Sequence, residues 1–278
     1  RGMSSAASDV YKRQFKDLAK RSLAMPTDLE IANAANLEPI EAIAWKLGIS
    51  STEIMPMGRS VAKITWDACK SRMNKPQGSL VLVTSVNPTP FGEGKTVTTI
   101  GLTQALCRIG QSATCVIREP SMGPVFGIKG GAAGGGYSQV LPMEDINLHF
   151  TGDLHAVTSA HNLLSALIDN HIKHGNESKL DSTKISWPRV LDMNDRALRD
   201  IVIGMGGAAN GHLRQDRFDI TAASEVMAIL VLASDYADLK KRLGEIVIGQ
   251  SIDGNPVKAS ELELSLIHIS ESTRRTTI

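Results

Sequence analysis

SLVLVTSVNPTPFGEGKTVTTIGLTQALCRIG, residues 79–110, contains the pattern that decides the expected fold. Its first eight residues, 79–86, form a nearly continuous apolar run rich in valine, which is typical of a parallel strand covered on both faces. Residues 95–109 place apolar side chains at helical spacing and stop at Gly110, a residue type that commonly follows the last helical turn. The stretch therefore predicts a strand, a glycine-containing loop and a helix, in that order.

The same alternation continues on both sides of this stretch. Residues 26–75 have the pattern of a helical lead-in that begins at Pro26-Thr27-Asp28. The other expected elements are a long helix at 154–174, strands at 113–117, 189–192, 201–203 and 219–221, and helices at 223–233 and 239–243. Because strands and helices alternate, the sequence predicts an α/β fold with a doubly wound, mostly parallel sheet behind a helical N-terminal lead-in.

Composition and charge narrow the class of protein. Lys plus Arg number 30 and Asp plus Glu 29, so there is no broad positive field to collect nucleic acid or an anionic membrane surface. We find no run of eighteen apolar residues and no signal-peptide pattern, and the three cysteines include no closely spaced pair. These observations predict a soluble, cytoplasmic protein that binds neither nucleic acid nor a membrane.

Residues 89–96, TPFGEGKT, end in the Gly-Lys-Thr of a phosphate-binding loop and lie between the predicted strand and helix, as that motif requires. Its glycines allow backbone N–H groups to approach a polyphosphate, Lys95 reaches the outer phosphates, and the Thr96 hydroxyl can bind magnesium. Thr89 stands where the common motif has glycine, so a tight strand-to-helix turn is the alternative. The fold is therefore expected to be of P-loop NTPase type, with nucleotide-binding residues Thr89, Pro90, Gly92, Glu93, Gly94, Lys95 and Thr96.

Polar residues near the ends of other predicted elements are further candidates. Arg118 follows the second predicted strand, at the edge where open parallel sheets bind ligands, and its guanidinium could stabilise a transferring phosphoryl group or form a surface ion pair. Asp192 ends a short apolar run and could hold magnesium or cap a turn. His149 and His155 flank a Thr-Gly-Asp turn and could approach a ligand, or be structural.

Several longer motifs occur in a fixed order along the chain: TPFGEGKT at 89–96, REPSMGP at 118–124, GIKGGAAGGGY at 127–137, PMEDINLHFTGD at 142–153, RVLDMNDR at 189–196 and FDITAASEVMA at 218–228. In order and spacing, from residue 26 to about residue 262, the sequence resembles formate–tetrahydrofolate ligases. The run at 127–137 carries most of the specificity, since the phosphate loop alone fits many ATPases and kinases.

The resemblance implies ATP-dependent ligation of formate to tetrahydrofolate through formyl phosphate, giving 10-formyltetrahydrofolate, ADP and phosphate. ATP and magnesium are the implied cofactors, and a monovalent cation is allowed. Formate and tetrahydrofolate are the implied substrates, and a full-length form is expected to be a homo-oligomer. By resemblance, Lys95 and Thr96 would hold nucleotide and metal, Arg118 would stabilise formyl phosphate, and Asp153 would lie near the reacting amine.

Two departures from the family pattern bear on activity. Val97 interrupts the threonine run that continues the family's phosphate loop, and these enzymes extend well beyond Leu262 into a part that supplies the aromatic folate platform. We therefore expect an ATP and formyl phosphate site without a complete folate pocket, and a chain that is inactive or unstable alone. The alternatives are a P-loop switch ATPase that acts through a protein partner, and a non-catalytic phosphate-binding remnant.

Both ends of the sequence differ from the rest. Residues 1–14 and 264–278 do not continue the neighbouring patterns, and the chain begins at Arg1 rather than at a methionine. We interpret them as a non-native leader and tail, such as translated adaptor sequence, and ordinary disordered termini are the alternative. Residues 15–263 would then form one P-loop nucleotide-binding domain, truncated on its C-terminal side.

Overall fold

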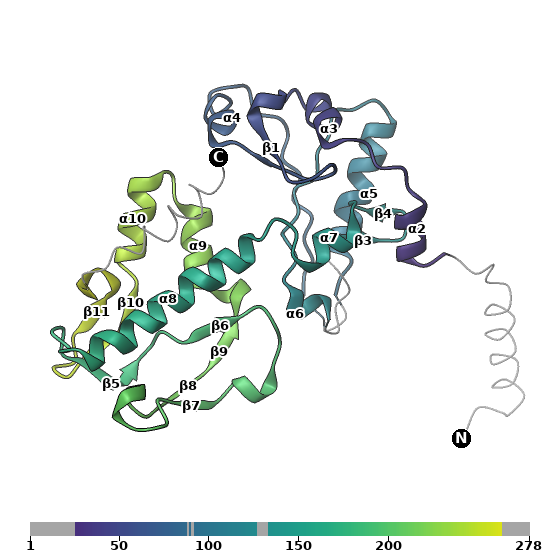
Figure 1. Ribbon diagram of the computed structural model, residues 1–278. Coiled ribbons are helices and arrows are strands. Elements are labelled where there is room, and N and C mark those ends of the chain that lie inside the picture. The colour runs from purple at the N-terminus through teal and green to yellow at the C-terminus, as the bar shows by residue number, and fades with distance from the viewer. Residues whose placement is uncertain (1–25, 88, 90–91, 127–132, 263–278) are drawn as a thin grey trace, which may run out of the picture.

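The computed structural model describes residues 26–87, 89, 92–126 and 133–262. It has the mixed α/β character that we predicted, with small sheets of two or three strands. In Figure 1, α2–α5, α7 and β1–β4 gather in one part of the molecule, and α8–α10 with β5–β11 form the other. The terminal segments 1–14 and 264–278 lie outside the described residues, as do the outermost residues of the predicted domain 15–263.

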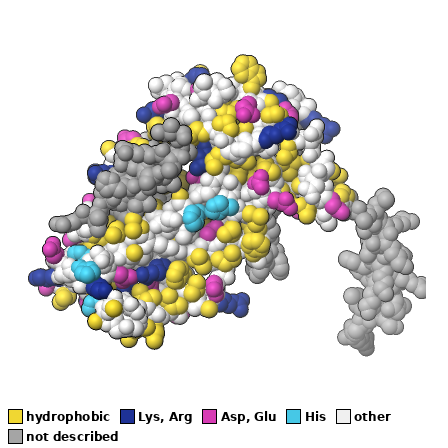
Figure 2. Space-filling model, viewed as in Figure 1, with side chains coloured by type: hydrophobic (Ala, Val, Ile, Leu, Met, Phe, Trp, Pro, Cys, Tyr) yellow, Lys and Arg dark blue, Asp and Glu magenta, His cyan; other side chains and the backbone are white. Residues whose placement is uncertain are grey.

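The predicted strands at 79–86 and 113–117 do not form in the structure. Both segments lack regular secondary structure, and several of their apolar side chains are open to solvent: Leu80 is 95% exposed, Val86 99% and Val116 89%. Figure 2 shows hydrophobic side chains reaching the surface over much of the face in view. A parallel strand is stabilised by neighbouring strands that its own sequence cannot supply. Within the described residues, the only parallel pairing joins β6 to β9, so the doubly wound parallel sheet is not what the structure has.

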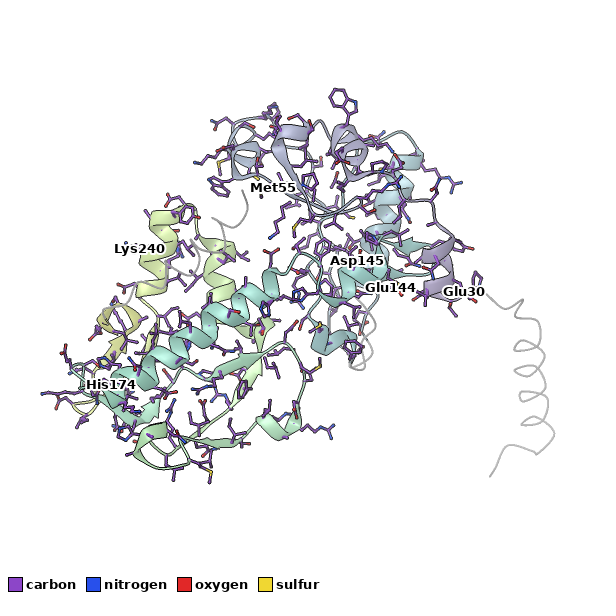
Figure 3. The ribbon with its side chains drawn as sticks, in the orientation of Figure 1. Glu30, Met55, Glu144, Asp145, His174 and Lys240 are labelled. Atoms are coloured by element: carbon purple, nitrogen blue, oxygen red, sulfur yellow. The ribbon has the colours of Figure 1, made fainter. Side chains whose placement is uncertain are left out.

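The lead-in is only partly helical. Helix α2 (Asp28–Ala34) begins at the predicted place, with Thr27 and Glu30 forming a reciprocal capping box, and α3 (Ile40–Lys46) follows. Figure 3 labels Glu30 on α2 and Met55 on β1. The chain then forms an antiparallel hairpin from β1 (Ile54–Pro56) and β2 (Ala62–Ile64), followed by α4 (Trp66–Lys70). Strands of three residues are too short to show a period of two, and the sequence did not predict them.

Helix α5 (Lys95–Arg108) forms where the sequence predicted it. Gly94 before its first residue and Gly110 after its last turn both have left-handed backbone, with φ of 65° and 84°. The short strands β3 (Gly134–Gly135) and β4 (Ser138–Gln139) pair beside it. Gly134 permits this pairing, because a Cβ there would lie 2.0 Å from the Ser138 carbonyl oxygen.

The main core lies between α8 (Asp153–Lys173) and a three-stranded antiparallel sheet in the order β11–β10–β5. The strands are β5 (Leu180–Ile185), β10 (Val247–Ser251) and β11 (Pro256–Lys258), and the flanking helices are α9 (Glu225–Leu232) and α10 (Tyr236–Gly244). The predicted inward residues Leu164, Ile168 and Ile172 are buried, and Leu163 and Leu167 are partly buried. The prediction of one long amphipathic helix is therefore confirmed.

Three predicted strands form within about a residue of their expected places. Strand β6 (Arg189–Leu191) runs parallel to β9 (Phe218–Ile220), and β7 (Ile201–Ile203) is antiparallel to β8 (Arg214–Asp216). Asn162 of α8 fixes β6, since its side-chain amide donates to the Val190 carbonyl and accepts from the Val190 N–H, both at 2.9 Å. The remaining helices are α6 (Met122–Val125), α7 (Met143–Leu148), η1 (Ser51–Glu53), η2 (Arg196–Leu198), η3 (Ala208–Asn210), η4 (Thr221–Ala223) and η5 (Ala259–Leu262).

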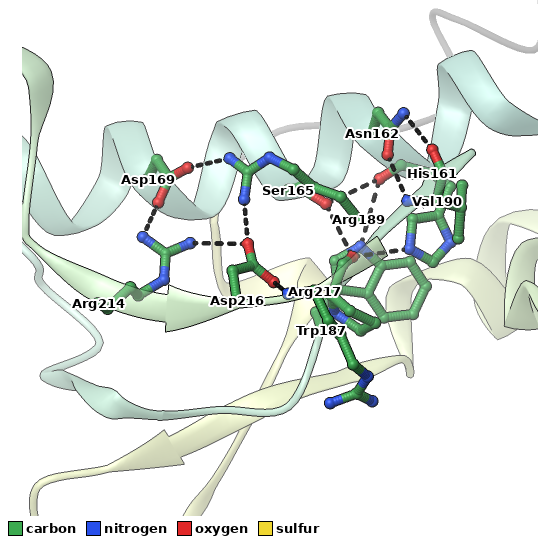
Figure 4. A network of polar contacts seen from close by, with 11 residues as sticks. His161, Asn162, Ser165, Asp169, Trp187, Arg189, Val190, Arg214, Asp216 and Arg217 are labelled. Atoms are coloured by element: carbon green, nitrogen blue, oxygen red, sulfur yellow. Dashed lines mark hydrogen bonds and ion pairs between the residues drawn. The ribbon is translucent and has the colours of Figure 1, made fainter. Parts of the chain in front are cut away.

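A polar network joins β6 and β8 to α8 (Figure 4). Arg189 bridges Asp169 and Asp216, and Arg214 contacts the same two carboxylates. The side chains of Arg214 and Asp216 are only 9% and 7% exposed, so these charges are paired away from bulk water. The network holds β6, whose C-terminal end leads directly to Asp192.

Beside this network, His161 of α8 is buried and stacks on Trp187, with ring centroids 4.0 Å apart. Its Nε2 donates to the Pro188 carbonyl at 2.9 Å, and its Nδ1 lies 2.8 Å from the Ser224 hydroxyl. Burial lowers the pKa of His161, and the bond to Pro188 opposes that shift.

Among the helices of the described residues, none combines the length and the apolar composition that spanning a membrane requires.

Candidate functional site

A cavity of about 180 Å³ lies where α6, α7, α8 and the end of β6 meet. Its lining combines apolar side chains with carboxylates, a hydroxyl and imidazoles: Glu119, Pro120, Met122, Leu148, His149, Leu154, His155, Thr158, Leu191, Asp192 and Met193. Most of these residues come from three separate sequence motifs, at 118–124, 142–153 and 189–196, and the other three, Leu154, His155 and Thr158, lie at the start of α8. An apolar pocket with a few convergent polar groups is the usual form of a small-molecule site.

Asp192 connects two walls of the cavity. Its carboxylate accepts hydrogen bonds from the Ser121 hydroxyl and, at 3.0 Å, from the Met122 N–H at the start of α6. This is the turn-capping role that the sequence left open as an alternative. An ionised carboxylate has about four acceptor sites, so capacity remains for a further ligand.

Asp153 is the first residue of α8 and follows Gly152, which has a left-handed φ of 78°. Its carboxylate accepts a hydrogen bond from Thr151 and forms an ion pair with Lys63, whose Nζ lies 2.7 Å from Oδ1. Lys63 comes from β2 in the lead-in, and nothing in its local sequence pattern marked it as a functional residue. The pairing depends on tertiary structure, which brings together residues 90 positions apart.

Glu119 is half-buried in the cavity wall, next to Arg118 in the sequence. Burial raises the pKa of its carboxyl, the negative charge of Asp153 adds to the effect, and the positive charge of Lys63 opposes it. In the sequence, Glu119 belongs to the motif at 118–124, but nothing in that motif assigned it a role. Perturbed carboxyl groups in clefts are typical of functional sites.

His149 and His155 lie on the cavity rim with their ring centroids 5.7 Å apart. The structure thus brings them to a site where they can meet a ligand, as the sequence allowed. By contrast, Figure 3 shows Glu144 and Asp145 on α7 and His174 at the end of α8, and all three are exposed and do not line the cavity.

The described part of the phosphate loop, Thr89 and residues 92–96, lies before and at the start of α5 and is mostly exposed. Gly92 and Gly94 have positive φ values of 84° and 65°, and a Cβ at either would meet nothing within 4 Å, so the backbone is open on that side. Lys95 is exposed and donates to the Ser85 hydroxyl at 3.1 Å. A helix N-terminus preceded by glycines is a common binding site for phosphate, because backbone N–H groups at the start of the helix point toward the ligand.

The remaining predicted loop residues add little further geometry. The carbonyl oxygen of Thr89 accepts a hydrogen bond from the Gly92 N–H at 3.2 Å. Glu93 is exposed, and Thr96 is half-buried in the first turn of α5. Pro90 lies outside the described residues. These positions therefore remain predicted nucleotide contacts.

The structure does not bring all predicted site residues together. Asp192 lines the cavity and Asp153 lies at its edge, one residue before Leu154, whereas Lys95, Thr96 and Arg118 are not among the residues that line it. Arg118 is exposed. Among the described residues, no group of three or more His, Cys, Asp or Glu side chains is arranged to hold a metal ion.

Fold and site together define a mixed α/β protein with a phosphate-loop motif at the N-terminus of α5 and a mainly apolar cavity that carries a few carboxylates and imidazoles. A family model described as formate–tetrahydrofolate ligase matches residues 26–267. The chain belongs to the formate–tetrahydrofolate ligase family.

Similar curated proteins carry the same description. The chain is 61% identical over 237 residues to a formate–tetrahydrofolate ligase of Rhizobium rhizogenes, and 59% identical over 238 and 240 residues to those of Paracoccus denitrificans and Thermosipho africanus. The matches cover 85%, 86% and 86% of this chain but only 42%, 43% and 44% of the relatives. The chain therefore spans less than half the length of these relatives.

Proposed function

We propose that the chain forms the part of a formate–tetrahydrofolate ligase that binds ATP and activates formate. The observation that carries the proposal is the Gly-Glu-Gly-Lys-Thr loop at the N-terminus of α5, with both glycines in left-handed backbone and open space beside them. Backbone N–H groups and the ammonium of Lys95 are suited to the phosphates of ATP. Thr96 and Asp192 would hold magnesium, which neutralises phosphate charge when bound.

The first step is attack on ATP by formate. One formate oxygen bonds to the γ-phosphorus, the bond from that phosphorus to the ADP oxygen breaks, and formyl phosphate and ADP result. Because formate and the γ-phosphate are both negative, the step needs positive groups that hold them together. In this proposal Lys95 acts on the phosphates and Arg118 on the formyl phosphate and its transition state.

The second step transfers the formyl group. The folate amine attacks the formyl carbon, the carbon–oxygen bond to phosphate breaks, and phosphate leaves with the oxygen that came from formate. The amine loses a proton as 10-formyltetrahydrofolate forms, and the carboxylate of Asp153 is the proposed group beside that nitrogen.

The exposed apolar side chains in two segments are evidence for our proposal that the sheet is more complete in a longer form of the protein. Residues 79–86 and 113–117 have the composition of buried parallel strands, and the parallel pair β6 and β9 is the kind of nucleus that such strands would extend. We propose that these segments join a doubly wound sheet of P-loop type in a full-length, homo-oligomeric, cytoplasmic enzyme.

Arg118 provides the test of the activation step. In a full-length version of the protein, Arg118→Ala should reduce formate-dependent ADP release by about 100-fold, because one donor that stabilises developing charge is commonly worth that much. Arg108→Ala is the matched control, since Arg108 is an exposed arginine in the last turn of α5 and should leave the rate unchanged. Equal rates for the two variants would refute the role of Arg118.

A further inference from the structure

Lys63 reaches the edge of the cavity from outside the motifs that identify the site. It lies in the middle of β2, and its Nζ is 2.7 Å from Oδ1 of Asp153 at the start of α8. Asp153 also accepts a hydrogen bond from the Thr151 hydroxyl through its other oxygen. Both carboxylate oxygens are therefore held, one by a cation and one by a hydroxyl, and the side chain has a fixed direction.

The pair differs from an ordinary surface ion pair. The side chain of Lys63 is 32% exposed, compared with 58% for Lys46, which forms an ion pair of the same 2.7 Å length with Glu38. The two carboxylates are similarly exposed, at 49% for Asp153 and 53% for Glu38, so the difference in burial lies on the lysine. Exposed ion pairs such as Lys46–Glu38 contribute roughly 0–1 kcal/mol to the free energy of unfolding and do little to fix the side chains in place. Lys63 instead connects the β1–β2 hairpin to the first residue of α8, across 90 positions of sequence.

Lys63 also balances the charge of the cavity. The carboxyl groups of Glu119, Asp153 and Asp192 lie close enough to influence one another: the negative charges of the two aspartates raise the pKa of Glu119, and the positive charge of Lys63 lowers it. Removing the ammonium would leave Asp153 without its cationic partner and increase repulsion among the three carboxylates. A carboxylate that repels its neighbours and lacks a partner would turn away from its present direction.

We propose that Lys63 is a positioning residue that holds the Asp153 carboxylate in the direction needed for formyl transfer to the folate amine. This inference rests on the proposed function. Lys63 acts through Asp153 rather than on the substrate, so its removal should slow the second step and leave ATP binding and formate activation at the phosphate loop intact.

The test compares Lys63→Met, Lys63→Arg and the control Lys46→Met in a full-length version of the protein. Lys63→Met should lower kcat for 10-formyltetrahydrofolate formation by about 100-fold, since misplacing a catalytic group by about 1 Å has an effect of that size. KM for ATP and the first-turnover burst of formate-dependent ADP should stay within twofold of the parent. Lys63→Arg, which keeps the charge, should recover most of kcat, and Lys46→Met should match the parent.

Asp153→Asn, alone and combined with Lys63→Met, shows whether Lys63 acts through Asp153. The double variant should be no slower than Asp153→Asn alone, because residues that act as one unit are not additive. An unchanged kcat in Lys63→Met, or fully additive losses in the double variant, would overturn the inference while the proposed function stands. If parent and Lys46→Met both lack formate-dependent ADP release, the proposed function fails, and the inference fails with it. Should Lys63→Met not fold, Lys63→Gln, which also removes the charge, replaces it in both comparisons under the same criteria.

Discussion

Removing the carboxylate of Asp216 should destabilise the fold strongly, because it is shared by two arginines. Asp216 is 7% exposed and contacts both Arg189 and Arg214, which also share Asp169 (Figure 4). In Asp216→Ala, two guanidinium groups, 21% and 9% exposed, would have one carboxylate between them. Breaking a buried pair from one side costs about 3–5 kcal/mol, since a charge stays buried without compensation.

Urea unfolding followed by circular dichroism measures this cost, with Asp219→Ala as control. Asp219 lies three residues away on β9 and pairs with Arg217 at 3.1 Å, but the two side chains are 41% and 55% exposed. The control should therefore lose only about 0–1 kcal/mol. A loss below about 1 kcal/mol in Asp216→Ala, equal to that of the control, would refute the view that this network holds β6 and Asp192 in place.

Three further predictions concern single groups. Burial lowers the pKa of His161 below its unfolded value of about 6.5, so in acid the unfolded chain binds more protons than the folded chain. The contribution of His161 to the free energy of unfolding should therefore be fully present above about pH 6.5 and be lost as pH falls toward the folded pKa. Equal urea midpoints at pH 7.5 and 5.5 would contradict this. Hydrogen bonds from the Arg72 side chain, and next from Ser50, lower the pKa of Glu53 to about 2, so the stability that they add is present above about pH 4.3 and lost as pH falls through about 2. In Arg72→Ala, NMR titration should find the pKa of Glu53 raised toward its unfolded value, and an unchanged pKa would count against the assignment. Lys95→Ala should weaken MgATP binding by about tenfold to a hundredfold in calorimetry, as expected for one hydrogen bond to a charged group, and undiminished affinity would exclude Lys95 from the phosphate site.

Local sequence signals predicted those elements whose boundaries are set locally. Glycines at 94 and 110 delimit α5, and the capping box of Thr27 begins α2. The apolar spacing of α8 likewise identified a helix that buries one face. In each case the residues that decide the structure lie within one or two helical turns.

Elements that depend on distant partners were missed or misassigned. Strands β10 and β11 meet at a turn containing Gly254, yet their place in the core depends on β5, some sixty residues earlier. The apolar run at 79–86 has strand composition but finds no neighbouring strand within the described residues. Local composition indicates which secondary structure a segment can form, and the presence of neighbouring strands decides whether it forms.

The candidate site divides in the same way. Asp153, Asp192 and His149 belong to motifs that could be recognised in the sequence, His155 lies two residues beyond one of them, and the structure places all four in or beside one cavity. Lys63 could not be predicted, because its role depends on a contact across 90 residues. Glu119 stood in a recognised motif, but only its burial and charged neighbours distinguish it.

The most direct test of formate activation follows an oxygen atom. A full-length version of the protein would be supplied with MgATP, tetrahydrofolate and formate labelled with ¹⁸O, and the phosphate released would be analysed by mass spectrometry. If formate attacks the γ-phosphorus, each phosphate should carry one oxygen from formate. Phosphate that instead takes its new oxygen from water, at a rate independent of formate, would contradict the account and indicate a simple ATPase.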